Sequence, residues 1–263
     1  FGIGGTSVIS RALGQGRREY AKKVCSFCMW CCAAVGLLMS AAFLFFMDQI
    51  LILIGASAET WSYAKTYLTL VSCSGPFVLI ANCYSNVIRA EGQSGKAMMG
   101  QLLGNLLNVV LDPLMILVLG WNIAGAAIAT VIGNVAGATY YIVYFLKGSS
   151  SLSIRLRDFT VQGGVASGVL AIGIPAALGN LLMSLSSILM NSQMAGYGDM
   201  AVAGVGVAMK VTMMTGMVCI GLGQGIQPLL GYCVGARNWN RYRNALRFSL
   251  IFAFSLSTVL TLI

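Results

Sequence analysis

Apolar residues come in long stretches along this chain, separated by short polar turns. Six stretches are long enough, or nearly so, to cross a bilayer as helices: 24–47, 63–86, 97–119, 122–146, 165–195 and 201–232. Two shorter apolar runs lie at 1–10 and 244–263. Because a membrane helix needs about 20 mostly apolar residues, the pattern predicts an all-α polytopic membrane protein. We expect about eight helices, with the first and last truncated.

The composition agrees with this pattern. Hydrophobic residues make up 58% of the 263 residues and charged residues only 9%, whereas a soluble domain carries roughly 25% charged residues. The chain opens on Phe1 rather than on Met, inside an apolar run without a basic segment before it, and it stops within another apolar run. We therefore expect a fragment of a longer, transporter-sized chain.

The net charge of +9 follows the expected topology. Nearly all basic residues fall in every second loop between the apolar stretches: Arg11, Arg17, Arg18, Lys22, Lys23, Arg89, Lys96, Lys147, Arg155, Arg157, Arg237, Arg241, Arg243 and Arg247. By the positive-inside rule these loops are expected to be cytoplasmic. The pattern predicts a multi-pass protein of the plasma membrane, the bacterial inner or cell membrane, and it gives no reason to expect a nucleic-acid partner.

A repeat connects the two ends of the chain. The stretch that begins at Gly2 lines up with the stretch that begins at Gly223, and at the same offset of 221 residues Gly14 falls on Gly235. Each copy ends a helix before a basic loop, and the copies lie six helices apart. An even spacing gives both copies the same orientation, which predicts two six-helix lobes related by a pseudo-twofold axis along the membrane normal in the full-length protein. Chance recurrence of glycine-rich helix ends is the alternative.

These lobes would divide the chain into three parts. Residues 1–146 are expected to form an incomplete N-terminal lobe, and residues 165–263 an incomplete C-terminal lobe. The interlobe linker, residues 147–164, is polar and rich in glycine and serine, with isolated apolar residues. It is expected to be cytoplasmic, either on the bilayer surface or as a plain solvated loop.

One face of the stretch 97–119 is polar. Gln101, Asn105, Asn108 and Asp112 are spaced 4, 3 and 4 residues apart, which aligns them along a helix. Asp112 is the one acidic residue deep within a predicted span. A charge there costs about 2.5–3.5 kcal/mol or more, so such residues usually mark an ion or proton path. The alternative is that these residues bond neighbouring helices together, which we favour for Gln101 and Asn105.

Five stretches, in this order and spacing, resemble the multidrug and toxic compound extrusion (MATE) family of transporters. They are GIGGTSVISRALGQG at 2–16, IRAEGQ at 88–93, NVVLDP at 108–113, GWNIAGAAIAT at 120–130 and IGIPAAL at 172–178. The resemblance covers the chain from the end of the family's second helix to its ninth. It implies a secondary active antiporter that exchanges cationic drugs for protons or sodium ions by alternating access of two lobes. It further implies small organic cations as substrates, no cofactor, a monomer in the lipid bilayer, and no enzymatic activity.

The resemblance also implies where the coupling ion binds. In such transporters an Asn, an Asp four residues on and a Thr in the following helix line the ion site of the first lobe; Asn108, Asp112 and Thr130 match these positions. Asn86 is a weaker candidate for the same site. No metal is expected beyond a possible sodium ion at Asp112, and the residues do not decide between proton and sodium.

Several other features suggest weaker roles. Pro113 cannot donate a backbone N–H to the carbonyl of Val109, and together with Pro175 and Gly223 it is a candidate hinge. A cluster of flexible methionines suits a cleft that accepts varied substrates, although packing is the more ordinary explanation: Met183, Met190, Met213 and Met217.

Competing functions have less support. A flippase for lipid-linked oligosaccharides, of related architecture, should line its cleft with several basic residues, and Lys210 is the one candidate. A membrane-embedded, lipid-modifying enzyme should have clustered acids or a nucleophile with a base; the chain contains no histidine and shows no such set. The parallel repeat argues against a receptor or channel.

Overall fold

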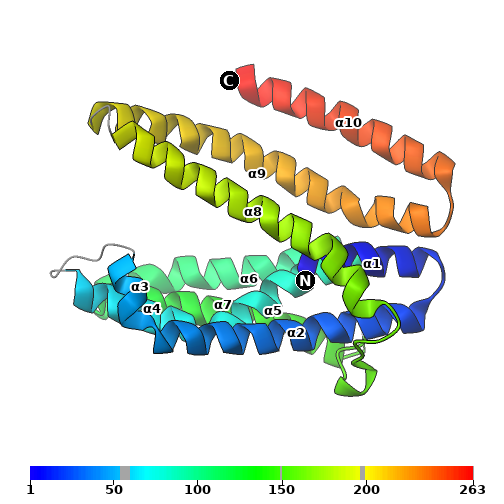
Figure 1. Cartoon of the computed structure of the whole chain (residues 1–263), viewed down its shortest axis with the longest axis horizontal. Helices are drawn as coiled ribbons and strands as arrows, with labels where there is room; N and C mark the ends of the chain where they lie inside the picture. Colours follow the sequence, from blue (N-terminus) through cyan, green and yellow to red (C-terminus); the bar gives the residue numbers. More distant parts are fainter. Residues whose placement is uncertain (54–59, 149, 196–198, 263) are drawn as a thin grey trace.

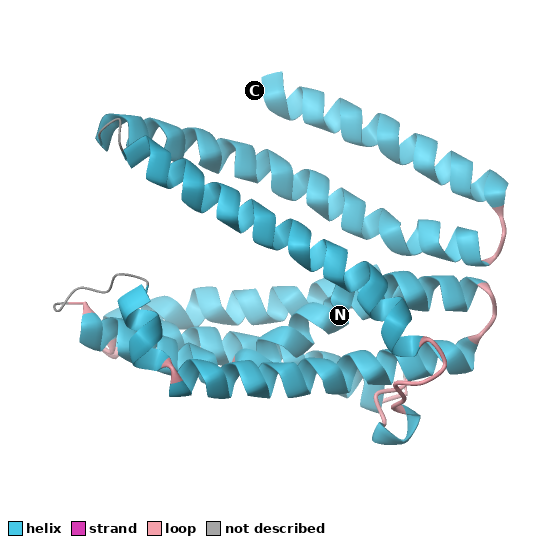
Figure 2. Ribbon diagram, viewed as in Figure 1, coloured by secondary structure: helices cyan, strands magenta, loops and turns pink. Residues whose placement is uncertain are grey.

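The computed structural model describes residues 1–53, 60–148, 150–195 and 199–262, and this part of the chain is helical without strands. The helices are α1 Gly2–Gly14, α2 Arg18–Phe45, α3 Met47–Leu53, α4 Trp61–Cys73, α5 Gly75–Ala90, α6 Ser94–Pro113, α7 Asn122–Leu146, α8 Val165–Ala195, α9 Asp199–Gly235 and α10 Trp239–Leu262. A π-helical turn, Leu114–Val118, extends α6, and the interlobe linker contains a short 3₁₀ turn, Leu156–Asp158. Figure 2 shows that short loops join most of these helices, whereas the longer interlobe linker joins α7 to α8.

Five helices in the described ranges are long and apolar enough to cross a membrane, or six if the bent pair α4 and α5 counts as one span. This confirms the prediction of a polytopic helical membrane protein. The prediction of one continuous helix over 63–86 is wrong, because α4 and α5 meet at Ser74 with a bend of 53°. Pro76 lies in the first turn of α5, where its missing N–H is tolerated but the preceding helix cannot continue straight.

The helices form two groups in Figure 1. The first helix group, α1–α7, packs around side chains of α1, α2, α5 and α7 that are buried together: Val8, Ile9, Val24, Phe27, Tyr84, Val87, Ile88, Tyr141 and Phe145. The second helix group, α8–α10, meets the first along α1, which packs against both α8 and α9. The division at the interlobe linker into an N-terminal and a C-terminal lobe stays a prediction.

The contact between α1 and α9 has the symmetry that the repeat requires. A Cβ atom at Gly14 would fall on the carbonyl oxygen of Tyr232, and a Cβ atom at Gly235 would fall on the carbonyl oxygen of Arg11. At the offset of 221 residues Gly14 corresponds to Gly235, and Arg11 to Tyr232. Exchanging the two helices therefore exchanges the two contacts, as a two-fold axis between them demands. This geometry supports the repeat over chance recurrence of glycines.

The interlobe linker is attached to the first helix group. The Glu91 carboxylate accepts hydrogen bonds of 2.8 Å from the hydroxyls of Ser150 and Ser151, and the Ser26 hydroxyl donates to the carbonyl of Arg155 at 2.7 Å. The stretch is thus fixed at several points along its length. These hydrogen bonds attach the stretch to α2 and to the end of α5. Its place on the bilayer surface or in solvent stays a prediction.

Candidate ion-binding site

Glycines bring α6 and α7 unusually close together. A Cβ atom at Gly104 would lie 2.8 Å from the carbonyl oxygen of Gly133, and one at Gly133 would lie 2.6 Å from the carbonyl oxygen of Gly104. One turn away, a Cβ atom at Gly137 would lie 3.3 Å from the carbonyl oxygen of Gly100. Pairs of glycines four residues apart on each helix allow backbones to approach in membranes, where close packing drives helix association. The approach puts polar side chains of both helices within reach of each other.

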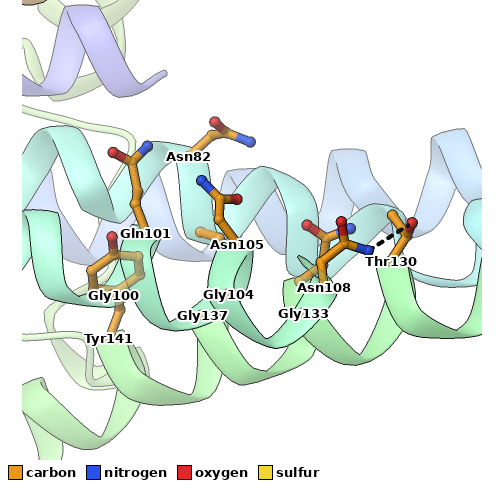
Figure 3. Close-up of a pocket in the computed structure, with 12 residues that line it drawn as sticks. Asn82, Gly100, Gln101, Gly104, Asn105, Asn108, Thr130, Gly133, Gly137 and Tyr141 are labelled. Atoms are coloured by element: carbon orange, nitrogen blue, oxygen red, sulfur yellow. Dashed lines mark hydrogen bonds between the residues drawn. The ribbon is translucent and has the colours of Figure 1, made fainter. Parts of the chain in front are cut away.

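Asn108 connects the two helices at the candidate site. Its Nδ2 lies 3.3 Å from Asp112 Oδ1 on the same helix and 3.4 Å from Thr130 Oγ1 on α7, and Figure 3 shows this second hydrogen bond. The Thr130 hydroxyl donates to the carbonyl of Ala126 at 2.9 Å. The structure therefore brings together Asn108, Asp112 and Thr130. Carboxylate, amide and hydroxyl oxygens are hard ligands that suit a sodium ion, and the carboxylate can hold a proton instead.

A cavity of about 190 Å³ adjoins these residues, between α5, α6 and α7. Its lining carries no charged side chain and is rich in carboxamides: Asn82, Gln101, Asn105, Asn108 and Asn134, with Thr130 and Tyr141. Figure 3 shows the carboxamides of Asn82, Gln101, Asn105 and Asn108. Polar groups at membrane depth are tolerated where they line a water-filled space. Three residues of the polar stripe predicted on 97–119, Gln101, Asn105 and Asn108, therefore face a hydrophilic space, and Asp112 contacts it through Asn108 without lining it.

Comparison with known proteins agrees with this architecture. The MatE family model matches residues 1–114 and 175–263. The multidrug export protein MepA of Staphylococcus aureus (strain NCTC 8325 / PS 47) is 33% identical over 267 residues, which cover 100% of this chain and 59% of that protein. This chain belongs to the MATE family.

Other similar MATE relatives extend this result. MepA of Staphylococcus haemolyticus (strain JCSC1435) is 31% identical over 99% of this chain and 58% of that protein. A solved outward-facing structure of a multidrug resistance MATE family transporter superposes with a TM-score of 0.91 at 27% identity, covering 97% of this chain and 57% of that one. A MOP superfamily transporter from Pyrococcus furiosus gives a TM-score of 0.90 with the same identity and coverage. The MATE chain described here thus spans less than two thirds of the length of these relatives.

Asn86 does not join the Asp112 set. Its Nδ2 donates to the carbonyl of Asn82 at 2.9 Å, and its side chain lines a different cavity, between α1, α2, α5 and α8. Asn82, one turn earlier on α5, lines this second cavity too and also lines the cavity beside Asn108. The sequence analysis selected Asn86, whereas the packing of α5 against α6 and α7 puts Asn82 at the cavity beside Asn108.

Other lining residues of this MATE cavity were missed in the sequence. Asn134 and Tyr141 lie on α7, four and eleven residues after Thr130, and both line the cavity with Gln101 and Asn105. The helical spacing of Asn134 from Thr130 was the signal that could have found it. The sequence favours helix-bonding roles for Gln101 and Asn105. Within the described residues the structure shows no hydrogen bond from either side chain to a neighbouring helix, and both side chains line the cavity.

The candidate hinges differ in their surroundings. Pro113 is followed by the π-helical turn, in which the Leu119 N–H donates to the carbonyl of Leu114 at 3.0 Å; such turns are frequent at functional sites. Pro175 lies inside the continuous helix α8. Gly223 lies in α9, and a Cβ atom there would meet no atom within 4 Å, so packing does not require glycine at this position. Their hinge roles stay predictions.

The four methionines of the candidate cleft lie on the second helix group, and their side chains are exposed over 44 to 68% of their surface: Met183, Met190, Met213 and Met217. None of them lines the cavity beside Asp112. Their role in binding substrate stays a prediction.

The close approach of α6 and α7 gives a first testable prediction. Replacing Gly104 by alanine is expected to lower drug efflux several-fold, because overpacking by one carbon against a backbone carbonyl costs about 1–3 kcal/mol and would lengthen the Asn108–Thr130 contact. Efflux at matched expression of the full-length protein measures this. Gly95→Ala, on the same helix with nothing within 4 Å, is the matched control. Equal efflux from both variants would contradict the prediction.

Proposed function

We propose that the full-length protein is a secondary active multidrug exporter, which exchanges cationic drugs for protons or sodium ions by alternating access. The observation that carries the proposal is the Asn108–Asp112–Thr130 set beside a cavity without charged lining. A single carboxylate in such surroundings can bind one cation at a time, so its occupancy can favour one conformation over the other. The names of its multidrug export relatives support the same activity.

The proposal includes the orientation and the place of the protein. Loops with basic residues follow α1, α5, α7 and α9, near Arg17, Arg89, Lys147 and Arg237. We place these loops in the cytoplasm and the helices in the plasma membrane, with the protein acting as a monomer and without a cofactor.

A lipid-linked oligosaccharide flippase is the second candidate function. A pyrophosphate headgroup would need basic side chains in the cavity, and the cavity beside Asp112 has none among the described residues. Lys210, the one basic candidate from the sequence, is exposed on α9. The lining thus favours a cationic or neutral substrate over an anionic lipid headgroup.

Ion dependence of efflux tests the proposal. Cells that lack other exporters and express the full-length protein are expected to expel ethidium faster than cells with an empty vector. Collapse of the proton gradient stops efflux if the coupling ion is a proton, and removal of external sodium stops it if the ion is sodium. Absence of ethidium export, or export that persists after both treatments, would sink the antiport proposal, provided that the protein is detected in the membrane.

A further inference from the structure

A guanidinium group spans the boundary between the two helix groups. Arg89, in the last turn of α5, donates from Nη1 to Gln224 Oε1 on α9 at 2.8 Å. The same guanidinium donates from Nε to the carbonyl of Ser85 at 3.1 Å and from Nη2 to the Ser85 hydroxyl at 2.8 Å. All three of its nitrogens therefore have partners. The two bonds to Ser85 fix the direction in which Nη1 reaches α9, so little side-chain freedom is lost when the bond to Gln224 forms.

This Arg89–Gln224 bridge is close to the places where the two groups touch. The glycine contacts of Gly14 and Gly235 join the ends of α1 and α9 near the basic loops. Gln227, three residues after Gln224, donates to the carbonyl of Ile3 at 3.5 Å. In Figure 1 the ribbons of the two groups run together beside α1 and diverge toward the opposite ends of α8 and α9. The bridge thus joins the end of α5 beside a basic loop to α9, at a position eleven residues before that helix ends.

We propose that the Arg89–Gln224 bridge is a conformational bond of the transport cycle, which holds the basic-loop side closed while the opposite side is open. The proposal rests on the alternating access proposed above, because opening the basic-loop side separates α5 from α9 and must break this bond. A hydrogen bond to a charged group in a half-buried place contributes enough to shift a two-state equilibrium by at least about tenfold. Arg89 is then a positioning residue that sets the balance between the two conformations and binds neither drug nor coupling ion.

The chain supplies a matched control for this arginine. Arg11, on α1, has the same local arrangement: Nε donates to the carbonyl of Ser7 at 3.0 Å and Nη2 to the Ser7 hydroxyl at 3.1 Å. Within the described ranges, the Arg11 side chain makes no hydrogen bond to the second helix group. Replacing Arg11 removes a similar charge and similar local bonds, whereas replacing Arg89 also removes the bond between the groups.

Hydrogen exchange of the purified full-length protein in lipid nanodiscs tests the bridge without drug and without an ion gradient. Exchange is read in peptides that cover 7–14 and 228–235, the facing parts of α1 and α9. Arg89→Gln and Gln224→Ala are each expected to raise exchange by about tenfold or more, and the double variant is expected to show no further increase. Arg11→Gln is expected to match the wild type. Thermal unfolding of each variant separates opening of the interface from loss of the fold.

Gln224→Glu supplies the opposite expectation. A carboxylate facing the Arg89 guanidinium replaces a hydrogen bond by an ion pair, so exchange in the same two peptides is expected to fall below that of the wild type. Two results would overturn the proposal. The first is that the two peptides exchange at the wild-type rate in Gln224→Ala. The second is that they exchange faster in Gln224→Glu than in Gln224→Ala. Because neither readout involves drug or ion, failure here is distinct from failure of the proposed antiport, which the ethidium measurement detects.

Discussion

Asp112→Asn is expected to abolish ion-coupled efflux. Asparagine keeps the size of the side chain and an oxygen that can still accept from Asn108, which lies 3.3 Å away. It removes the negative charge and the titratable oxygen that a proton or a sodium ion needs. Loss of a charge-assisted contact costs on the order of 1.5–3 kcal/mol, so ion affinity is expected to fall by at least about tenfold and coupled export with it.

The measurement is ethidium efflux at matched expression, wild type against Asp112→Asn, at two external pH values and with or without sodium. Asp48→Asn is the matched control, because Asp48 pairs with Lys65 at 2.8 Å in an exposed ion pair, and exposed pairs contribute little. Normal pumping by Asp112→Asn would show that Asp112 only bonds its neighbours together, as polar residues in membrane bundles often do.

Gly235→Ala is expected to reduce efflux by about ten- to hundredfold. The added Cβ would fall on the carbonyl oxygen of Arg11, and a backbone carbonyl inside a helix cannot move aside as the end of a side chain can. Overpacking of this kind costs about 1–3 kcal/mol, and it acts on a contact that joins the two helix groups. Gly14→Ala, the equivalent position in the repeat, is expected to have a similar effect because its Cβ would meet Tyr232 in the same way.

Gly225→Ala is the control for this second prediction. It lies on the same helix, α9, and a Cβ atom there would meet nothing within 4 Å. Alanine at this position therefore introduces no clash and removes the helix-propensity cost of glycine, about 1 kcal/mol. Ethidium efflux and the thermal unfolding temperature of the purified full-length protein are measured for all three variants. Wild-type efflux from both Gly14→Ala and Gly235→Ala would show that the two helix groups do not need this close contact during transport.

Relations within one helix were predictable from the sequence. Asn108 and Asp112 are four residues apart, and the helical period alone puts them one above the other; the structure confirms their contact. The membrane class followed from apolar stretches, and the MATE family from the order of five motifs. In each case the prediction uses the spacing of residues that are near in the sequence, or the composition of one continuous stretch.

Relations between helices were decided by the tertiary structure. The position of Asn82 rather than Asn86 beside the site depends on the packing of α5, and the bond from Asn108 to Thr130 depends on how closely two glycine-faced helices approach. The bond from Arg89 to Gln224 joins residues far apart in the sequence, and no local period relates them. The sequence by itself determined the membrane class, the family and the polar face that carries Asp112, and the family resemblance predicted Thr130 beside it. Packing decided which further side chains line the cavity and which hold the two helix groups together. Contact across helices depends on backbone separation, which no spacing in the sequence encodes.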